Sequence, residues 1–342
     1  MAIAKDLLEL FNNVNYFRDM NMRLNLITLT LLSAFSITSF AEDAPKTHSH
    51  PEEKGVFPAT PAAEPASPWT LSSNVSVVSN YYARGVSQSW NMPAIQGGAD
   101  LSHSSGFYAG VWGSSISERT YVGASTEFDV YGGYNGTIAA VEGMGWTVGA
   151  IGYFYPGGGW DKYDLLTLDQ GRKINEDFTT YEGNAGLSYK WLSAKASVTL
   201  GEWYGANKNT GWSKSSSGST YIELNANIPL PFWGLNLIGH VGRLDVKGEL
   251  VNDGSFPNAN GTAESIVETK ADMTDYKIGL SKAFEIAGTT GWNGGLYYVG
   301  GTNGGSSGYW GTRGYGGSSF TTKPGSKDLT DDTFILTLGR AF

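Results

Sequence analysis

From Trp69 to the last residue, apolar and polar side chains alternate through twelve long segments of the chain. A period of two is the pattern of a β-strand that turns one face toward an apolar environment. Most of these segments have ten or more residues, whereas strands in globular proteins commonly have about five or six. A tilted strand needs about 9–11 residues to cross a bilayer. The expected strands are residues 70–84, 94–103, 106–116, 123–135, 144–155, 177–190, 192–204, 219–228, 233–243, 273–284, 291–300 and 332–342.

The connections between these segments alternate between short and long. The short ones are the stretches 104–106, 191, 229–233 and 285–290, and a long one, rich in glycine and serine, covers residues 301–331. Outer-membrane barrels have tight turns on the periplasmic side and longer loops outside. The sequence therefore predicts an all-β fold, a transmembrane antiparallel β-barrel of about 12 strands, over residues 69–342.

The N-terminal part has the pattern of an exported protein. Residues 22–41 combine one cation, Arg23, with a short apolar run and small residues before Ala41, which predicts a signal peptide cleaved after that alanine. The apolar run is shorter than the about 20 residues of a spanning helix. Residues 1–21 are interpreted as an upstream extension from a start codon assigned too early, and residues 42–68, rich in proline, alanine and glutamate, as a disordered linker.

Composition excludes several functional classes. The chain has no cysteine, so that a disulfide framework, a thiolate metal site and a cysteine nucleophile are all ruled out. Its net charge is −9, whereas nucleic-acid binding requires a basic surface. We therefore expect no nucleic-acid partner.

The expected lumen is polar and carries both signs of charge. In residues 219–228, Ile222 and Leu224 alternate with Glu223 and Asn225, as expected when one face meets lipid and the other lines a lumen. The pore-lining residues expected from such faces are Arg84, Asp100, Glu127, Asp129, Glu182, Lys190, Lys195, Glu223, His240 and Lys277.

Two interpretations of this lumen remain open. Acidic side chains in a ring favour cations, so the small acidic excess predicts a weak cation preference. Alternatively, the charged side chains pair across the lumen and fill it. A barrel of about 12 strands is wider than those of about eight, which side chains fill, and narrower than porins of about 16–18.

Catalytic and metal-binding patterns are sparse. The barrel segment contains only His103 and His240, and no G-x-S-x-G turn accompanies them. We interpret His240 as a hydrogen-bonded lumen residue and His48 and His50 as solvated linker histidines. The prediction is that the protein is not an enzyme and holds no metal or other cofactor.

Aromatic residues near the segment ends predict membrane girdles, with core packing as the alternative. Near the expected outer ends lie Tyr81, Tyr82, residues 153–155, Trp203, Tyr204, Tyr297 and Tyr298, and near the inner ends Trp69, Phe107, Trp146, Trp191, Trp233 and Trp292.

The last segment ends on an aromatic residue. Phe334, Leu336, Leu338 and Phe342 share one face, which we expect to meet lipid and to form the C-terminal signal for the barrel-assembly machinery. Arg340 lies on the same face and is expected to reach the headgroups at the periplasmic rim.

One block resembles a known family. The stretch "ARGVSQSWNMPAIQGGADLSHSSGFYAGVW" is similar to the opening of the TorF porin family, the Gcw_chp group of bacterial outer-membrane proteins, and the resemblance extends over about residues 69–342. Asn80 departs from the aspartate that the family usually has there. The resemblance implies an outer-membrane barrel with pore activity and transfers no catalytic residues.

These observations predict a bacterial outer-membrane channel for passive diffusion of ions or small polar solutes. The alternative function is a non-conducting barrel that serves as a surface anchor or adhesion platform through its outward loops. The expected partners are outer-membrane lipid and lipopolysaccharide, the barrel-assembly machinery, and the solutes or ions themselves.

Overall fold

The computed structural model describes residues 67–162, 174–252, 267–303, 309–310 and 327–342. The expected extension 1–21, the expected signal peptide 22–41 and all but the last two residues of the expected linker 42–68 lie outside this described part.

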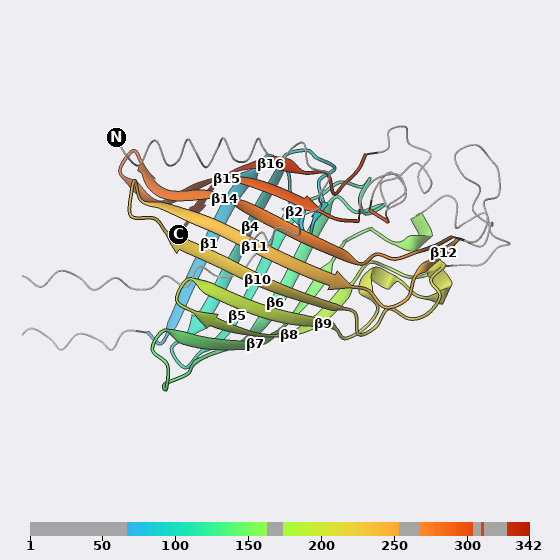
Figure 1. The fold of residues 1–342 in the computed structure, drawn as a ribbon, viewed down its shortest axis with the longest axis horizontal. Coiled ribbons are helices and arrows are strands. Elements are labelled where there is room, and N and C mark those ends of the chain that lie inside the picture. Colours follow the sequence, from blue (N-terminus) through green and yellow to red (C-terminus); the bar gives the residue numbers. More distant parts are fainter. Residues whose placement is uncertain (1–66, 163–173, 253–266, 304–308, 311–326) are drawn as a thin grey trace, which may run out of the picture.

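Twelve antiparallel strands close into a barrel, which confirms the predicted fold (Figure 1). Around the ring their order is β1-β16-β15-β14-β11-β10-β9-β8-β7-β6-β5-β4, and β1 pairs with both β16 and β4. The strands of the ring are β1 (Trp69–Val78), β4 (Ala94–His103), β5 (Phe107–Ser115), β6 (Thr126–Thr137), β7 (Met144–Phe154), β8 (Thr180–Tyr189), β9 (Leu192–Thr199), β10 (Thr220–Pro229), β11 (Leu235–Asp245), β14 (Met273–Ile286), β15 (Thr289–Gly301) and β16 (Thr333–Ala341).

The remaining elements are short and lie in the connections. They are the hairpin strands β2 (Tyr82–Ala83) and β3 (Val86–Ser87), the hairpin strands β12 (Leu250–Asn252) and β13 (Val267–Thr269), and the 3-10 turns η2 (Trp160–Lys162), η4 (Trp203–Gly205) and η5 (Lys208–Thr210). Within the described ranges no helix has the length and apolarity needed to cross a membrane.

Tight turns gather at one end of the barrel and long connections at the other (Figure 1). The turn between β4 and β5 is possible because Gly106 has a φ of 111°, in the left-handed region that favours glycine. The C-terminal Phe342 pairs with Ser73 through backbone hydrogen bonds of 2.8 and 3.2 Å at the turn end. The end with the turns and the C-terminus is therefore the periplasmic end, and the long loops face outward.

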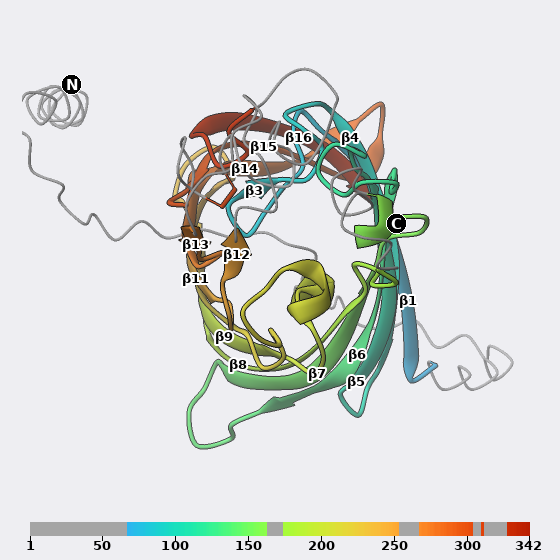
Figure 2. The same ribbon diagram turned by 90° about the vertical axis from the view of Figure 1, so that its right-hand side faces the viewer.

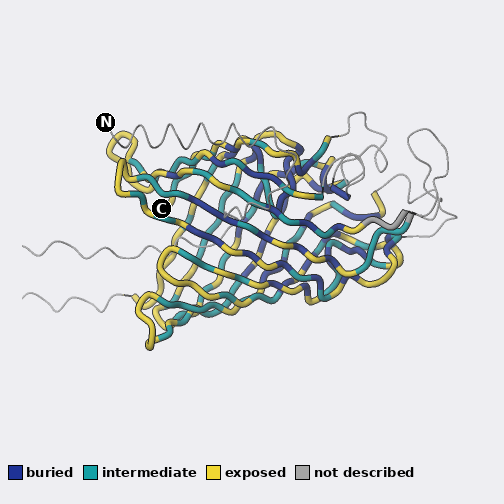
Figure 3. The backbone as a smooth tube through the Cα atoms, in the orientation of Figure 1, coloured by how far each residue is buried: buried dark blue, intermediate teal, exposed yellow. Residues whose placement is uncertain are grey.

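Exposed and buried positions alternate along the strands (Figure 3). On β10, for example, Ile222 and Leu224 are exposed while Glu223 and Asn225 are buried. Exposed large apolar side chains occur around the whole ring, from Leu71 on β1 to Leu336 on β16. A closed barrel with an apolar outward face satisfies its backbone in lipid. The protein is a transmembrane barrel of the outer membrane, and its outward face contacts outer-membrane lipid.

Two of the expected strands are shorter than the alternation indicates. The stretch 70–84 leaves the wall after Val78, because the chain turns into the barrel as the β2–β3 hairpin. The stretch 192–204 leaves it after Thr199 and enters η4. Alternation alone does not distinguish a strand that stays in the wall from an extended segment that folds inward.

Candidate functional site

A hairpin crosses the lumen near its outer end. We call residues 79–93, which join β1 to β4 and contain β2 and β3, the inward hairpin; Figure 2 shows it inside the ring of strands. Its tip reaches Tyr221 of β10, because the Arg84 guanidinium carbon lies 4.3 Å from the centre of that ring. In the ring order β10 stands five places from β1 and six from β4. The hairpin therefore reaches the opposite wall.

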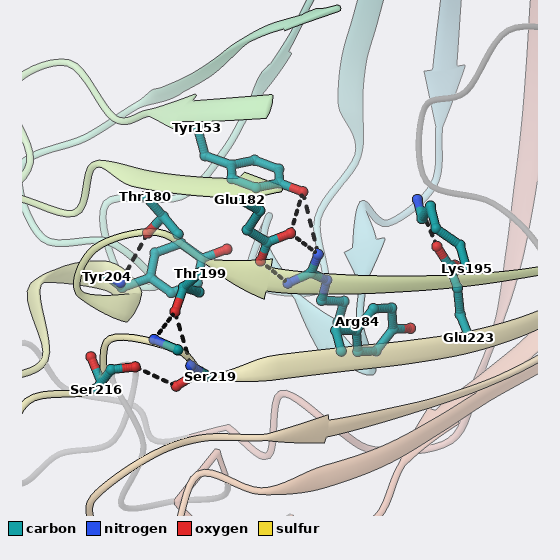
Figure 4. Close-up of polar contacts among 12 residues, drawn as sticks. Arg84, Tyr153, Thr180, Glu182, Lys195, Thr199, Tyr204, Ser216, Ser219 and Glu223 are labelled. Atoms are coloured by element: carbon teal, nitrogen blue, oxygen red, sulfur yellow. Dashed lines mark hydrogen bonds and ion pairs between the residues drawn. The ribbon is translucent and has the colours of Figure 1, made fainter. Parts of the chain in front are cut away.

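Arg84 fixes the tip by an ion pair with the barrel wall. Its Nη1 and Nη2 donate to the two carboxylate oxygens of Glu182 on β8, each at 2.6 Å (Figure 4). Nη2 also donates to the Tyr153 hydroxyl at 3.3 Å. A bidentate pair of this kind is strong and restricts orientation as well as distance.

The neighbouring Gly85 packs on the adjoining part of the wall. It has a φ of 77°, and a Cβ at this position would lie 2.7 Å from Asp275 Cβ and 2.8 Å from Met273 Sδ. Both residues belong to β14. The tip thus fits between β14 and β8 only with glycine at position 85.

The wall from β9 to β14 holds a dense polar network. Lys195 Nζ lies 2.6 Å from Glu223 Oε1, and His240 Nε2 lies 2.7 Å from Asp275 Oδ2. The other ring nitrogen of His240 lies 2.6 Å from Asn225 Oδ1. Acids and bases compensate one another here, as buried charged groups require.

The wall from β4 to β8 is acidic. None of these five strands contains lysine or arginine, and Asp100, Glu127, Asp129 and Glu182 all project from it toward the lumen. The strand register gives their order along the barrel. Glu127 lies nearest the outward loops, and Asp129 follows two residues later on β6. Asp100 and Glu182 lie level with the next lumen-facing residue of β6, Tyr131, to which Gly110 and Ile151 link them across the sheet.

Two carboxylates of this wall are only partly satisfied. Glu127 and Asp129 are 5% and 4% exposed, and Glu127 Oε2 and Asp129 Oδ1 have no hydrogen-bond partner among the described residues. Glu127 Oε1 accepts from the Tyr155 hydroxyl at 2.7 Å, and Asp100 accepts from Tyr131 at 2.6 Å. An unpartnered buried carboxylate oxygen is costly, so this wall retains capacity for a cation or proton.

Aromatic residues cover the outer mouth. We call the buried aromatic members of the largest apolar cluster, apart from Tyr221 in the wall, the aromatic cap: Trp90, Tyr121, Tyr155, Trp160, Phe178, Trp203, Trp212, Tyr309 and Trp310. The connection after β9, which carries η4, lies inside the ring in Figure 2. Tyr204 of η4 packs against the cap, and burial raises the pKa of its hydroxyl to about 12. Tyr204 is therefore neutral at physiological pH.

The expected girdle is wrong for several of its outer members. Tyr153 and Tyr155 face the lumen, where they bind Arg84 and Glu127, and Trp203 is buried in the cap. These side chains lie near strand ends, as expected, but they are surrounded by protein, including inward-folded loops, and not by lipid headgroups.

The expected pore-lining residues fall into distinct places. Arg84 and Glu182 form the ion pair that holds the hairpin tip, which we call the clamp. Lys195, Glu223 and His240 belong to the polar network, and Lys277 Nζ lies 5.2 Å from the ring centre of Tyr297. Asp100, Glu127 and Asp129 form the acidic wall.

The structure corrects the expectation for Lys190. This residue is exposed in the two-residue turn between β8 and β9, with its Nζ 5.2 Å from the Tyr189 ring centre. It does not line the lumen, because β8 ends at Tyr189.

Sequence reasoning missed Asp275, Tyr153 and Tyr221. Asp275 stands two residues before Lys277 on the same face of β14, so the alternation already contained its signal. Tyr221 likewise stands two residues before Glu223 on the same face of β10. Tyr153 had no such signal, since a ring at a strand end suits either headgroups or a packed interior.

The C-terminal strand has the expected face. Phe334, Leu336, Leu338 and Phe342 are all exposed on the outside of the barrel. Within the described ranges no group of three or more histidine and acidic side chains is arranged to hold a metal ion.

Comparisons with known proteins found one family. A family model described as "Bacterial protein of unknown function (Gcw_chp)" matches residues 62–342. No curated protein matches the chain.

Several solved structures are similar in fold. The COG4313 outer membrane channel from Pseudomonas putida F1 is 14% identical with a TM-score of 0.36, over 84% of this chain and 100% of that one. OccD3 (OpdP) from Pseudomonas aeruginosa is 9% identical with a TM-score of 0.34, over 82% and 66%. LpxR from Salmonella typhimurium is 9% identical with a TM-score of 0.32, over 79% and 99%. These likenesses concern the barrel alone.

Proposed function

Since the chain belongs to the Gcw_chp family of bacterial proteins, whose function is unknown, we propose that it is an outer-membrane channel. Ions or small polar solutes would diffuse through its lumen, past a constriction formed by the inward hairpin. The observation that carries this proposal is the bidentate contact of Arg84 with Glu182, which holds a short loop across a polar barrel interior.

The contacts at the tip of the inward hairpin are mainly polar. The hairpin tip meets the wall through an ion pair, a ring face and a glycine, while Val86 and Trp90 behind the tip are buried in the largest apolar cluster. Arg84 has a side-chain exposure of 17% and Glu182 one of 3%. Salt screens a buried pair of this kind only weakly, so a cation that displaces Arg84 must contact Glu182 directly.

The charge of the lumen favours cations. The ion pairs of Arg84 and Lys195 neutralise Glu182 and Glu223. Asp100, Glu127 and Asp129 have no ion pair with a described cation, so the acidic wall keeps a negative charge when these groups are ionised. Acidic rings of this kind select cations over anions.

A second candidate is a non-conducting barrel that anchors or displays its outward loops. The aromatic cap favours it, because Trp160, Phe178 and Trp203 are almost fully buried across the outer mouth. We propose no catalytic role for His240, because both of its ring nitrogens are engaged by Asn225, Tyr221 and Asp275.

Single-channel recording in planar bilayers separates the two candidates. The channel predicts discrete conductance steps for the wild-type protein in potassium chloride, and larger steps after Arg84→Ala. Arg243→Ala is the matched control, because Arg243 also forms an ion pair, with Asp245 at 2.8 Å, but is exposed and lies outside the clamp. A complete lack of steps in both the wild type and Arg84→Ala would contradict the channel and favour the anchor.

Lipopolysaccharide and the barrel-assembly machinery remain proposed partners. Their support is the exposed apolar face of β16 and its terminal Phe342.

A further inference from the structure

Arg84 occupies a site built for a planar cation. Both oxygens of Glu182 accept from its guanidinium at 2.6 Å. The guanidinium carbon also lies 4.3 Å from the ring centre of Tyr221 and 5.8 Å from that of Tyr153. A carboxylate and two aromatic faces are the groups that recognise guanidinium and ammonium ions elsewhere. The three residues come from β8, β10 and β7, so the wall itself makes the site.

The surroundings of this site hold more acid than Arg84 can neutralise. Asp129 lies one lumen-facing position nearer the outward loops than Glu182, and its partners across the sheet are Tyr153 and Trp112. Its Oδ1, like Glu127 Oε2, is buried and has no hydrogen-bond partner within the described part of the chain. Buried carboxylate oxygens with unused acceptor capacity point to a second positive group beside the first.

Arg84 reaches the site on a short tether. Strands β2 and β3 contribute only two residues each. Arg84 itself has a φ of 45° and Gly85 one of 77°, so both residues of the turn are left-handed. Arg84 is thus carried by a small hairpin, whereas its partner Glu182 belongs to the barrel wall.

We propose that Glu182, Tyr153, Tyr221 and the adjacent Glu127 and Asp129 form a binding site for organic cations that carry guanidinium or alkylammonium groups. Arg84 fills this site as a tethered ligand, and a basic solute displaces it. In the channel proposed above this makes basic solutes the preferred substrates. The binding site itself rests on the wall residues, and its occupancy is measurable whether or not the barrel conducts.

The test measures binding of agmatine, which combines a guanidinium with an ammonium and lacks a carboxylate. Purified full-length protein in detergent is titrated by calorimetry as wild type, Arg84→Ala and Arg243→Ala. Removal of Arg84 increases the fraction of molecules in which the site is free to bind agmatine. Arg84→Ala is therefore expected to bind agmatine at least about tenfold more tightly than the wild type. Arg243→Ala, which removes an exposed cation outside the site, should bind like the wild type.

A second substitution shows where the agmatine binds. Adding Glu182→Gln to Arg84→Ala should abolish the gain, and putrescine should bind Arg84→Ala more weakly than agmatine because it has no planar group for a bidentate contact. Arg84→Lys, which retains a charge on the tether, guards against a folding defect and should bind agmatine less tightly than Arg84→Ala.

Equal affinity of wild type and Arg84→Ala would overturn the proposal, as would tight binding that survives Glu182→Gln. Single-channel recording tests the channel separately. Conductance steps without agmatine binding would retain the channel and reject the site. Agmatine binding without conductance steps would retain the site and reject the channel.

Discussion

Gly85 in the inward hairpin lies so close to Asp275 in the wall that a methyl group at position 85 would stand 2.7 Å from Asp275 Cβ. Residue 85 therefore controls whether the hairpin can seat against β14. Any larger residue must move the tip away from the wall or displace Met273.

Gly85→Ala is expected to unseat the hairpin and increase single-channel conductance. Gly288→Ala is the matched control, because Gly288 also has a positive φ, 72°, but nothing within 4 Å of a new Cβ. Both substitutions carry the backbone cost of about 1 kcal/mol for alanine in the left-handed region, and only Gly85→Ala adds the clash. Equal conductance of the two variants would contradict a seated constriction.

Neutralising the acidic wall should reduce cation preference. In a potassium chloride gradient, the reversal potential of Glu127→Gln/Asp129→Asn is expected to shift toward the chloride value relative to the wild type, because two carboxyl groups that attract cations when ionised are removed. Glu142→Gln, at an exposed turn on the periplasmic side, should leave the reversal potential unchanged. If the double variant has the wild-type reversal potential, the selectivity does not come from this wall.

His240→Ala should destabilise the barrel without removing a reaction. The substitution deprives Asn225 and Asp275 of buried contacts at 2.6 and 2.7 Å, which costs about 1–3 kcal/mol of unfolding free energy. Urea unfolding in lipid vesicles measures the change, with His103→Ala as the control because His103 contacts Ser105 at the exposed turn. A stability loss no larger than that of His103→Ala would remove His240 from the network.

Arg340 should mark the periplasmic boundary of the membrane. Its guanidinium carbon lies 4.7 Å from the Phe342 ring centre and 5.6 Å from that of Trp292, so these rings and the cation would share headgroup depth. Because the chain has no cysteine, Arg340→Cys and Leu336→Cys can each carry one spin label. Collision with oxygen should be stronger at 336 than at 340; the opposite order would place the boundary elsewhere.

Removal of the terminal ring should slow assembly. Phe342→Ala is expected to fold more slowly than the wild type in vesicles that contain the barrel-assembly machinery, and at the wild-type rate in vesicles without it. Phe107→Ala removes another exposed ring of the same rim and should not show this difference. A slower rate in both kinds of vesicle would assign Phe342 to intrinsic folding.

Much of the barrel could be predicted because a membrane imposes a repeated constraint. Each spanning strand must show an apolar side to lipid and must be long enough to cross, as β10 and β16 illustrate. The same alternation placed Glu182, Glu223 and His240 inside. The alternation was wrong at Lys190, where the strand had already ended. Position near a strand end was a poor guide for Tyr153 and Tyr155, because aromatic rings suit more than one environment.

The sequence by itself determined the fold class, the inward and outward faces, and the acidic character of the strands β4 to β8, since these follow from local periodicity and composition. Only the tertiary structure decided that Arg84 meets Glu182 across the lumen, that Gly85 seats on β14, and that Trp203 packs inside the aromatic cap. The physical reason is that these contacts join residues far apart in the chain. A period of two records which face a side chain takes and contains no information about which distant loop will cover it.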